Sequence, residues 1–313
     1  MKTRAHSILV VIVLCITLAL TACGSLRPIM PETTEAETTE VSNTEMTEAV
    51  TNTYVEYSRV FFDKSNTLYG PLALVNDTHE YTFPAQASQS LVSIWEYRNA
   101  HTAEGTTSVY KVAWTDLKLD GDAAAALHEW LTDFYKATGK NDIVISAAYR
   151  TYEEQEGFAV PAGKSNHHTG YGVTLKVYDG ENTKSLTENA AYYDWLVANA
   201  HKYGFVVRYP DNKSAITGIS DYLDHFHYVG CAPAAYMKQN NLCLEEFVEG
   251  IKTDNPLVVT DANGQEWMIF YLHCPEEGQC SFELPAVCEY TVSGDNDGGC
   301  IVCVSVLESA SQQ

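Results

Sequence analysis

The sequence predicts an α+β fold with a mostly antiparallel sheet, flanking helices and a small C-terminal β region. Two observations support this prediction. Residues 54–253 alternate helical and strand-like segments without internal repeats. From residue 254 onward, short strand-like runs and turn signals replace the helices. The apolar content of 45% is ordinary for a globular protein, so the chain can bury a sizeable core.

The residues before this fold have a different character. Residues 1–22 combine a basic start with an apolar run, which is typical of a secretory signal peptide. The run ends in Leu20-Thr21-Ala22-Cys23, which resembles a bacterial lipobox, so we expect Cys23 to be lipidated. Residues 23–53 are predicted to form a disordered tether rich in Glu and Thr. These features indicate a lipoprotein anchored in the membrane through Cys23, on the extracellular face of a bacterial cell.

The net charge of −22 argues against nucleic acid as a partner. The chain has nine cysteines, of which seven lie beyond the lipobox. An odd number leaves at least one thiol free or paired between chains. We expect at least one disulfide among the last five: Cys274, Cys280, Cys288, Cys300 and Cys303. Half a zinc knuckle at Cys300-x-x-Cys303 is the alternative, but strand residues three apart face opposite ways, which favours structural cysteines.

The pattern of apolar residues predicts each element. Helices are expected at residues 122–138, 188–203 and 233–248, and strands at 143–147, 172–178, 205–208 and 225–229. The first helix carries an apolar stripe and ends at Gly139. Further strands are expected at 256–260, 266–272, 281–284, 288–292 and 301–306. Turn signals lie at 261–264 and 295–298; the second could be compared with a calcium loop, but it lacks the distal ligands and is interpreted as a turn.

Two segments rich in histidine carry the candidate chemistry. They are Ser165-Asn166-His167-His168 and Asp224-His225-Phe226-His227. A catalytic zinc needs three protein ligands and an open position for water, and a nearby Glu to take the proton of that water. The motif His-Glu-x-x-His is absent, which excludes the zinc proteases that bind metal through one helix.

Together with Tyr149-Arg150-Thr151-Tyr152 and Gln155, these segments resemble the VanY-like zinc D-alanyl-D-alanine carboxypeptidases of the hedgehog/D,D-peptidase fold. The resemblance runs over most of residues 54–250. It implies a carboxypeptidase-like domain at 54–253, with residues 254–313 as a Cys-containing β region. It also implies zinc as cofactor and peptidoglycan stem peptides as partner.

Carried over residue by residue, the resemblance assigns roles to individual side chains. His167 and His225 fall on zinc-ligand positions. Arg150, Gln155 and Ser165 fall on substrate-binding positions, and Arg150 is also expected to stabilise charge near the scissile bond.

Two positions depart from the family pattern. Thr174 stands where the family has an Asp ligand, and Tyr222 stands where it has the catalytic Glu. A threonine oxygen is neutral and does not offset the charge of a metal dication. A tyrosine has a reference pKa near 10 and is a poor base at neutral pH, and losing a general base typically costs about 10²- to 10⁴-fold in rate. We therefore expect zinc binding to be weak or absent.

Neighbouring side chains offer two ways to read these substitutions. Asp179, Asp221, Asp224, His168 and His227 are candidates to fill the vacant roles, which would leave an active zinc carboxypeptidase that removes terminal D-Ala. The alternative is a catalytically impaired homologue that binds or senses the cell wall. Because two independent losses are harder to rescue than one, the sequence favours the second function.

Overall fold

The computed structural model describes residues 57–103, 105–286 and 288–306. The first part of the chain holds the following helices and strands: β1 (Tyr57–Phe62), β2 (Leu91–Ser93), α2 (Ile94–Ala100), β3 (Lys111–Val112), β4 (Lys118–Asp120), α3 (Gly121–Thr138), β5 (Ile143–Ala147), α4 (Tyr152–Gln155), β6 (Gly172–Tyr178), β7 (Thr183–Ser185), α5 (Ala190–Asn199), β8 (Phe205–Val207), α6 (Ser214–Thr217) and β9 (His225–Tyr228). The remainder holds α7 (Cys231–Asn240), α8 (Leu244–Thr253), β10 (Leu257–Thr260), β11 (Glu266–His273), β12 (Cys280–Pro285), β13 (Tyr290–Gly294) and β14 (Gly299–Ser305). Short 3₁₀ helices connect several of them.

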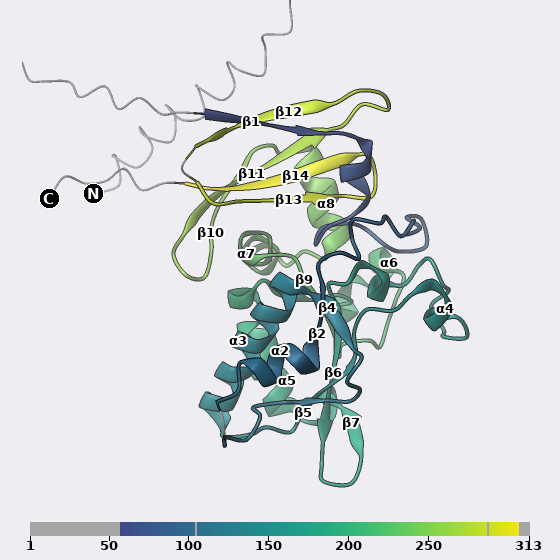
Figure 1. The fold of residues 1–313 in the computed structure, drawn as a ribbon, viewed down its shortest axis with the longest axis vertical. Coiled ribbons are helices and arrows are strands. Elements are labelled where there is room, and N and C mark those ends of the chain that lie inside the picture. The colour runs from purple at the N-terminus through teal and green to yellow at the C-terminus, as the bar shows by residue number, and fades with distance from the viewer. Residues whose placement is uncertain (1–56, 104, 287, 307–313) are drawn as a thin grey trace, which may run out of the picture. The chain divides into compact units, whose positions relative to one another are not determined.

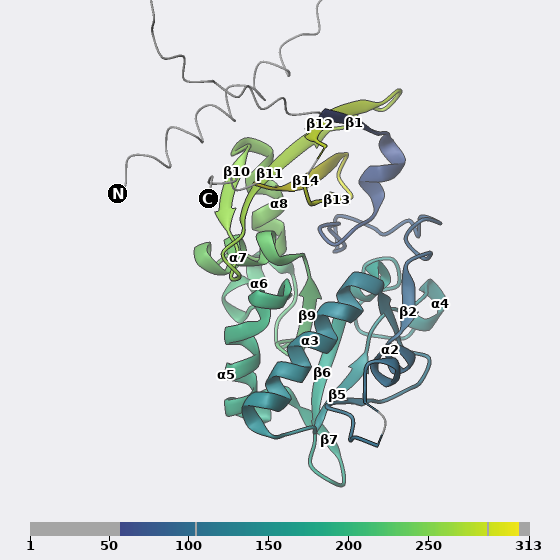
Figure 2. The same cartoon turned by 60° about the vertical axis from the view of Figure 1, so that its left-hand side comes forward.

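The larger sheet has the strand order β3-β5-β6-β9-β8, with β7 pairing on β6. Its pairs are antiparallel except for β3 with β5. One face packs against α3 and α5, and Figure 2 shows both helices beside β6 and β9. The core on this face includes Leu127, Trp130 and Phe134 of α3, and Val173 and Leu175 of β6. The α+β fold with a mostly antiparallel sheet is therefore as predicted.

The helix expected at residues 233–248 was wrong, because two helices occupy this stretch. α7 ends at Asn241, which adopts the left-handed conformation with φ 52°. A new helix then starts at Cys243, whose backbone N–H is capped by the Glu246 carboxylate at 2.9 Å. A short polar residue that tolerates positive φ, followed by a capping box, ends one helix and begins the next.

The five strands expected after residue 254 are all present. Four of them form an antiparallel sheet of order β10-β11-β14-β13, and β12 pairs with β1 from the start of the described chain. Figure 1 shows β1 and β12 side by side, although β1 lies in the range that the sequence assigned to the first domain. The turn at 295–298 forms as expected, with the Asp295 carboxylate accepting the backbone N–H groups of Asp297 and Gly299.

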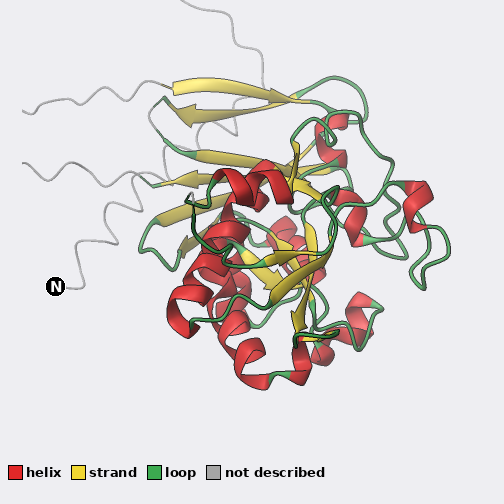
Figure 3. Cartoon of the chain, turned by 60° about the horizontal axis from the view of Figure 1, so that its bottom comes forward, coloured by secondary structure: helices red, strands yellow, loops and turns green. Residues whose placement is uncertain are grey.

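The C-terminal sheet shares its core with the helices before it. Phe247, Val248 and Ile251 of α8 pack with Ile269 of β11 and Ile301 of β14. α7 contacts both β8 of the larger sheet and β10, and helices lie between the two groups of strands in Figure 3. Some 50 residues bury too little surface to be stable alone, and this shared core provides the missing burial.

The seven described cysteines are free thiols in this structure, so the expected disulfide is not formed. Cys300 and Cys303 point to opposite faces of β14, since Cys300 contacts Cys274 whereas Cys303 lies in the core with Ile269. Within the residues that the structure describes, none of the helices has the length and apolar character to cross a membrane. The predicted signal peptide (1–22), the lipidation site Cys23 and the tether (23–53) lie outside the described residues.

Candidate functional site: a polar centre on the larger sheet

The candidate site lies on the face of the larger sheet that turns away from α3 and α5. On β6 and β9 the alternate residues face this side, so that Thr174 lies opposite His225 and Gly172 opposite His227. Gly172 is needed here, because a Cβ at this position would lie 3.0 Å from the His225 ring and 2.6 Å from Asn166. The sheet register thus brings polar side chains from two strands together.

His167 reaches the same face from a 3₁₀ helix, Asn166–Thr169. The Ser165 hydroxyl caps this helix by accepting the His167 backbone N–H at 3.3 Å, and Gly170 ends it in the left-handed conformation. The ring centroids of His167 and His225 are 4.5 Å apart. The predicted convergence of these two imidazoles is confirmed.

Hydroxyl groups connect the two imidazoles. The Thr174 hydroxyl lies 3.2 Å from Nδ1 of His225 and 2.9 Å from the Tyr222 hydroxyl. The Tyr222 hydroxyl in turn lies 3.3 Å from Nε2 of His167. The Tyr222 ring stacks on His225 and on Tyr209, with centroid distances of 5.0 and 5.8 Å. The two residues that depart from the family pattern are therefore the ones that join the histidines.

Asn166 fixes which nitrogens carry protons. Its amide oxygen Oδ1 lies 2.8 Å from Nε2 of His225 and 3.0 Å from Nδ1 of His227. Nε2 of His227 donates to the Pro71 carbonyl at 2.8 Å, so Nδ1 of a neutral His227 carries no proton. Oδ1 and this unprotonated Nδ1 are both acceptors, so the hydrogen-bond network favours the amide turned by 180°, with its NH₂ group donating to both rings. His225 then carries its proton on Nδ1 and donates it to Thr174.

A continuous chain of neutral hydrogen bonds results. It runs from Asn166 to His225, from His225 to Thr174, from Thr174 to Tyr222 and from Tyr222 to His167. Of the imidazole nitrogens in this chain, Nδ1 of His167 lacks a hydrogen-bond partner among the described residues.

Burial keeps all three histidines neutral. It lowers the pKa of His167 to about 3, with the nearby Arg150 guanidinium adding to the effect. It also lowers the pKa of His227 to about 3, with help from the positive charge of Arg208. Burial, reinforced by His167 and His227, holds the pKa of His225 well below its usual range. A buried imidazole without an anionic partner titrates only in strong acid.

The donors at this centre do not fit a zinc ion. Zinc in proteins is held by imidazole, thiolate or carboxylate groups. The centre offers Nε2 of His167, Nδ1 of His225 and two neutral hydroxyls. Among the described residues, no group of three or more His, Cys, Asp or Glu side chains could hold a metal ion. No chemical step through zinc follows from this set of residues.

Three of the neighbours considered as replacements for the missing groups, Asp224, Asp179 and His168, are engaged elsewhere. Asp224 pairs with Lys176 and accepts from the Ser185 hydroxyl. Asp179 pairs with Lys184. Asp221 differs from the others, because it is exposed on the wall of the pocket in front of the centre and accepts only from the Ser220 hydroxyl, at 3.4 Å, among the described residues. His168 donates from Nδ1 to the Arg150 carbonyl at 2.8 Å and accepts the Gly163 N–H at 3.0 Å on Nε2. His168 therefore supports the Arg150 backbone, and neither of its nitrogens is free to bind a metal.

The predicted substrate-binding residues line one pocket of about 310 Å³ in front of the centre. Arg150, Gln155 and Ser165 line it together with His167, Tyr222 and His225. Arg150 donates to the Gln155 side chain at 3.0 Å, and its guanidinium lies 4.2 Å from the centroid of the Phe158 ring. Arg150 has no carboxylate partner among the described residues, although the chain has 41 acidic residues. Burial lowers the pKa of Arg150, but an arginine stays charged at neutral pH.

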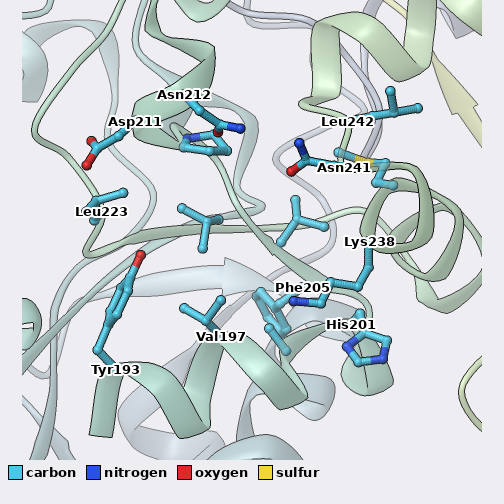
Figure 4. Close-up of a pocket in the computed structure, with 15 residues that line it drawn as sticks. Tyr193, Val197, His201, Phe205, Asp211, Asn212, Leu223, Lys238, Asn241 and Leu242 are labelled. Carbon is cyan, nitrogen blue, oxygen red and sulfur yellow. The ribbon is translucent and has the colours of Figure 1, made fainter. Parts of the chain in front are cut away.

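A second pocket, of about 430 Å³, lies apart from these residues. Figure 4 shows Lys238 and His201 at one end of it and Asp211 and Tyr193 at the other, with the apolar side chains of Val197 and Phe205 between them. It contains neither Arg150 nor any histidine of the polar centre.

Sequence reasoning missed two residues of the site. Asn166 stands inside the histidine motif but was treated as a spacer; its position next to His167 was the available signal. Tyr209 lines the pocket and stacks on His225 at 5.5 Å, and no sequence pattern points to it.

Comparison with known proteins supports the same family as the motifs. Residues 156–231 match the VanY family model, described as D-alanyl-D-alanine carboxypeptidase. A D-alanyl-D-alanine carboxypeptidase of Enterococcus faecium is 31% identical over 203 residues, which cover 62% of this chain and 64% of that protein. Another from Enterococcus faecalis is 37% identical over 114 residues, covering 36% and 38% of the two chains. The chain thus spans less than two thirds of the length of each of these relatives.

The fold agrees with a solved structure as well. The D,D-dipeptidase VanXYg, solved in complex with a D-Ala-D-Ala phosphinate analogue, is 24% identical and superposes with a TM-score of 0.66. The superposition covers 80% of this chain and all of VanXYg, so the similarity of fold extends over the whole of that protein. With the family match and the relatives above, these findings show that the chain is similar in sequence to the VanY-like D-alanyl-D-alanine carboxypeptidases and shares the fold of the D,D-peptidase VanXYg.

Proposed function

We propose that this protein is a lipoprotein on the extracellular face of a bacterial membrane whose VanY-like domain binds peptidoglycan stem peptides without hydrolysing them efficiently. In this proposal residues 1–22 are a signal peptide and residues 23–53 a tether lipidated at Cys23. Residues 54–253 bind the peptide, and residues 254–313 complete the fold. The apolar run and lipobox-like sequence support the location, and the family supports the ligand.

The observation that best supports this loss of catalysis is the pair of hydroxyl groups that connects His167 and His225 by hydrogen bonds. In a zinc enzyme, the space between ligand atoms is held by the metal and its water. Here the hydroxyls of Thr174 and Tyr222 satisfy the facing nitrogens of His225 and His167. A metal would have to break these bonds and would gain no anionic ligand in return.

Arg150 supports binding of a peptide that ends in a carboxylate. Its guanidinium is half-buried in the pocket and is oriented by Gln155 and Phe158, without an internal carboxylate partner in the described chain. A guanidinium in this state binds a carboxylate through two parallel hydrogen bonds. The terminal carboxylate of a stem peptide ending in D-Ala-D-Ala meets this requirement.

Calorimetry with a stem pentapeptide ending in D-Ala-D-Ala tests the binding. We expect the unmodified protein to bind it and Arg150→Gln to weaken binding about 10- to 100-fold, because a hydrogen bond to a charged group contributes roughly 1.5–3 kcal/mol. Arg98→Gln is the matched control, since Arg98 donates to the Tyr110 carbonyl outside the pocket and should bind as the unmodified protein does. Equal affinities in all three proteins would contradict the assignment of Arg150.

Metal analysis combined with a D-Ala release assay tests the loss of catalysis. The unmodified protein should hold far less than one zinc per chain and release no D-Ala above background. Thr174→Asp with Tyr222→Glu should restore zinc first and hydrolysis second, whereas either change alone should give little. Stoichiometric zinc in the unmodified protein, with turnover that is lost in His225→Ala, would show that it is an active carboxypeptidase.

A further inference from the structure

Three cysteines meet where the β1–β12 pair joins the C-terminal sheet. Sγ of Cys274 lies 3.0 Å from Sγ of Cys280 and 3.7 Å from Sγ of Cys300. Cys274 follows β11, Cys280 begins β12 and Cys300 lies on β14. Residues from three different strands or their ends therefore place the sulfur atoms of Cys280 and Cys300 close to that of Cys274. Figure 1 shows β11, β12 and β14 in this part of the molecule.

Neighbouring contacts fix the backbone around this group. The backbone N–H of Cys274 donates to the Gly298 carbonyl at 3.0 Å, and Cys300 lies opposite Leu272 in the β11–β14 ladder. Cys280 lies opposite Phe62 in the β1–β12 ladder. The sulfur atoms thus approach each other because three strand ends are held in register, so only small side-chain rotations separate Cys274 from a bond to either neighbour.

We propose that Cys274, Cys280 and Cys300 form an oxidative modification site, in which Cys274 makes a disulfide with Cys280 and Cys300 is the alternative partner. A disulfide has an S–S length of about 2.05 Å, and the pair at 3.0 Å is the nearer of the two. Cys288, in the connection between β12 and β13, takes no part, because its thiol donates to the Pro285 carbonyl at 3.1 Å.

The state of the thiols favours a disulfide over a metal site. Burial raises the pKa of Cys274 and of Cys300 to about 11 and that of Cys280 to about 12. Metals bind the thiolate, which is scarce at neutral pH when the pKa is this high. The finished disulfide carries no charge and is therefore not disfavoured by the same burial, whereas the thiolates that form it are scarce, so oxidation should be slow at neutral pH and faster at higher pH.

The solvent exposure of each thiol determines which cysteine reacts first. Cys280 is partly exposed, whereas Cys274 is 4% and Cys300 0% exposed. A small disulfide such as oxidised glutathione reacts first with the Cys280 thiolate, which forms a mixed disulfide and releases one reduced thiol. The Cys274 thiolate then attacks the Cys280 sulfur, which forms the internal bond and releases the second thiol. Two protein thiols are oxidised and one external disulfide is reduced to two thiols.

Exchange within the group needs no further oxidant. The Cys300 thiolate attacks the Cys274 sulfur, the Cys274–Cys280 bond breaks, and Cys280 leaves as a thiolate. The number of disulfides stays at one, and one thiol of the group always remains free. Of the seven described cysteines, one disulfide leaves five as thiols.

Peptide mapping of the full-length protein tests the proposal. The native protein is incubated with oxidised glutathione, alkylated, and digested with a Glu-specific protease, which separates Cys274 from Cys280 by cutting after Glu276 or Glu277. We expect most molecules to carry a Cys274–Cys280 bond with Cys300 alkylated. A sample oxidised in denaturant is the reference, and its pairing should be spread over the seven cysteines. Cys274 alkylated in most native molecules, or bonded outside the group, would overturn the proposal.

Three variants separate the two partners. Cys280→Ser should divert Cys274 to Cys300, and Cys300→Ser should leave the Cys274–Cys280 bond intact. Cys288→Ser, a matched control from the same region, should leave the map unchanged. A free Cys274 in oxidised Cys280→Ser would overturn the role of Cys300. The map of the unmodified protein decides the main pairing if a variant fails to fold.

Discussion

The six-stranded sheet and the four-stranded C-terminal sheet bury opposite kinds of side chain. The larger sheet buries His167, Thr174 and His225 on one face, joined by hydrogen bonds that leave no formal charge at the centre. The C-terminal sheet buries an apolar layer, with Ile269 and Ile301 packed on α8. The first arrangement depends on the identity of each donor and acceptor, whereas the second depends on volume and shape. Substitutions at site positions such as 174 and 222 can therefore change the chemistry of the larger sheet, while the C-terminal sheet continues to stabilise the fold.

One buried ion pair connects the two regions, and breaking it should have the largest effect. Arg208, which follows β8, is fully buried and binds Glu245 of α8 at 2.6 and 2.9 Å. Glu245→Gln leaves a buried charge unpaired and should cost about 3–5 kcal/mol in the free energy of unfolding, as measured by urea denaturation.

The exposed pair between Arg59 and Glu283 provides the control for that experiment. Glu283→Gln should cost below about 1 kcal/mol, because solvent screens exposed pairs. The comparison also tests whether the regions fold together. A single cooperative transition that shifts as a whole is expected for Glu245→Gln, and two separated transitions would show that the sheets unfold independently.

The next prediction tests whether the apolar core of the C-terminal sheet contributes to stability without affecting peptide binding. Ile269→Ala removes a fully buried side chain from the C-terminal core and should cost about 2–5 kcal/mol in stability. Val258→Ala on the adjacent strand is the control, since Val258 is 39% exposed and should cost much less. Calorimetry should give both variants the peptide affinity of the unmodified protein at a temperature where they are folded. Loss of affinity in Ile269→Ala would mean that the C-terminal core shapes the pocket.

Acidification should lower the free energy of unfolding through the buried histidines of the polar region. His167 and His227 have a pKa of about 3 in the folded protein, against a reference value of 6.5. Below pH 6.5 the unfolded chain binds protons that the folded protein does not, so stability is highest above pH 6.5 and falls as the pH drops toward 3. Between pH 7 and 5.5 the two groups should together cost about 2.5 kcal/mol in the free energy of unfolding.

Urea denaturation with a chelator present measures this dependence. His227→Gln removes one of the two titrating groups, so its stability should fall less steeply over the same pH range. An unchanged slope would show that the pKa of His227 is the same in the folded and unfolded protein.

The sequence alone determined most of the fold, because apolar periodicity and glycine stops act locally. The stripe Leu127, Trp130 and Phe134 defined α3, and strict strand patterns defined β6. The motifs also identified the family and predicted that His167 and His225 meet. Only the resemblance predicted this contact. The separation of the two residues along the chain does not predict it, because no local rule brings such distant residues together.

Only the tertiary structure decided how the substituted positions are used. Whether Asp224 or His168 could replace a missing group depended on where each side chain points, and strand register and backbone partners turn both away from the centre. The pairing of β1 with β12 and the meeting of Cys274, Cys280 and Cys300 also depend on contacts between distant segments. The hydrogen-bonded chain through Thr174 and Tyr222 required distances that a sequence does not contain, because hydrogen bonding depends on positions within a few tenths of an ångström.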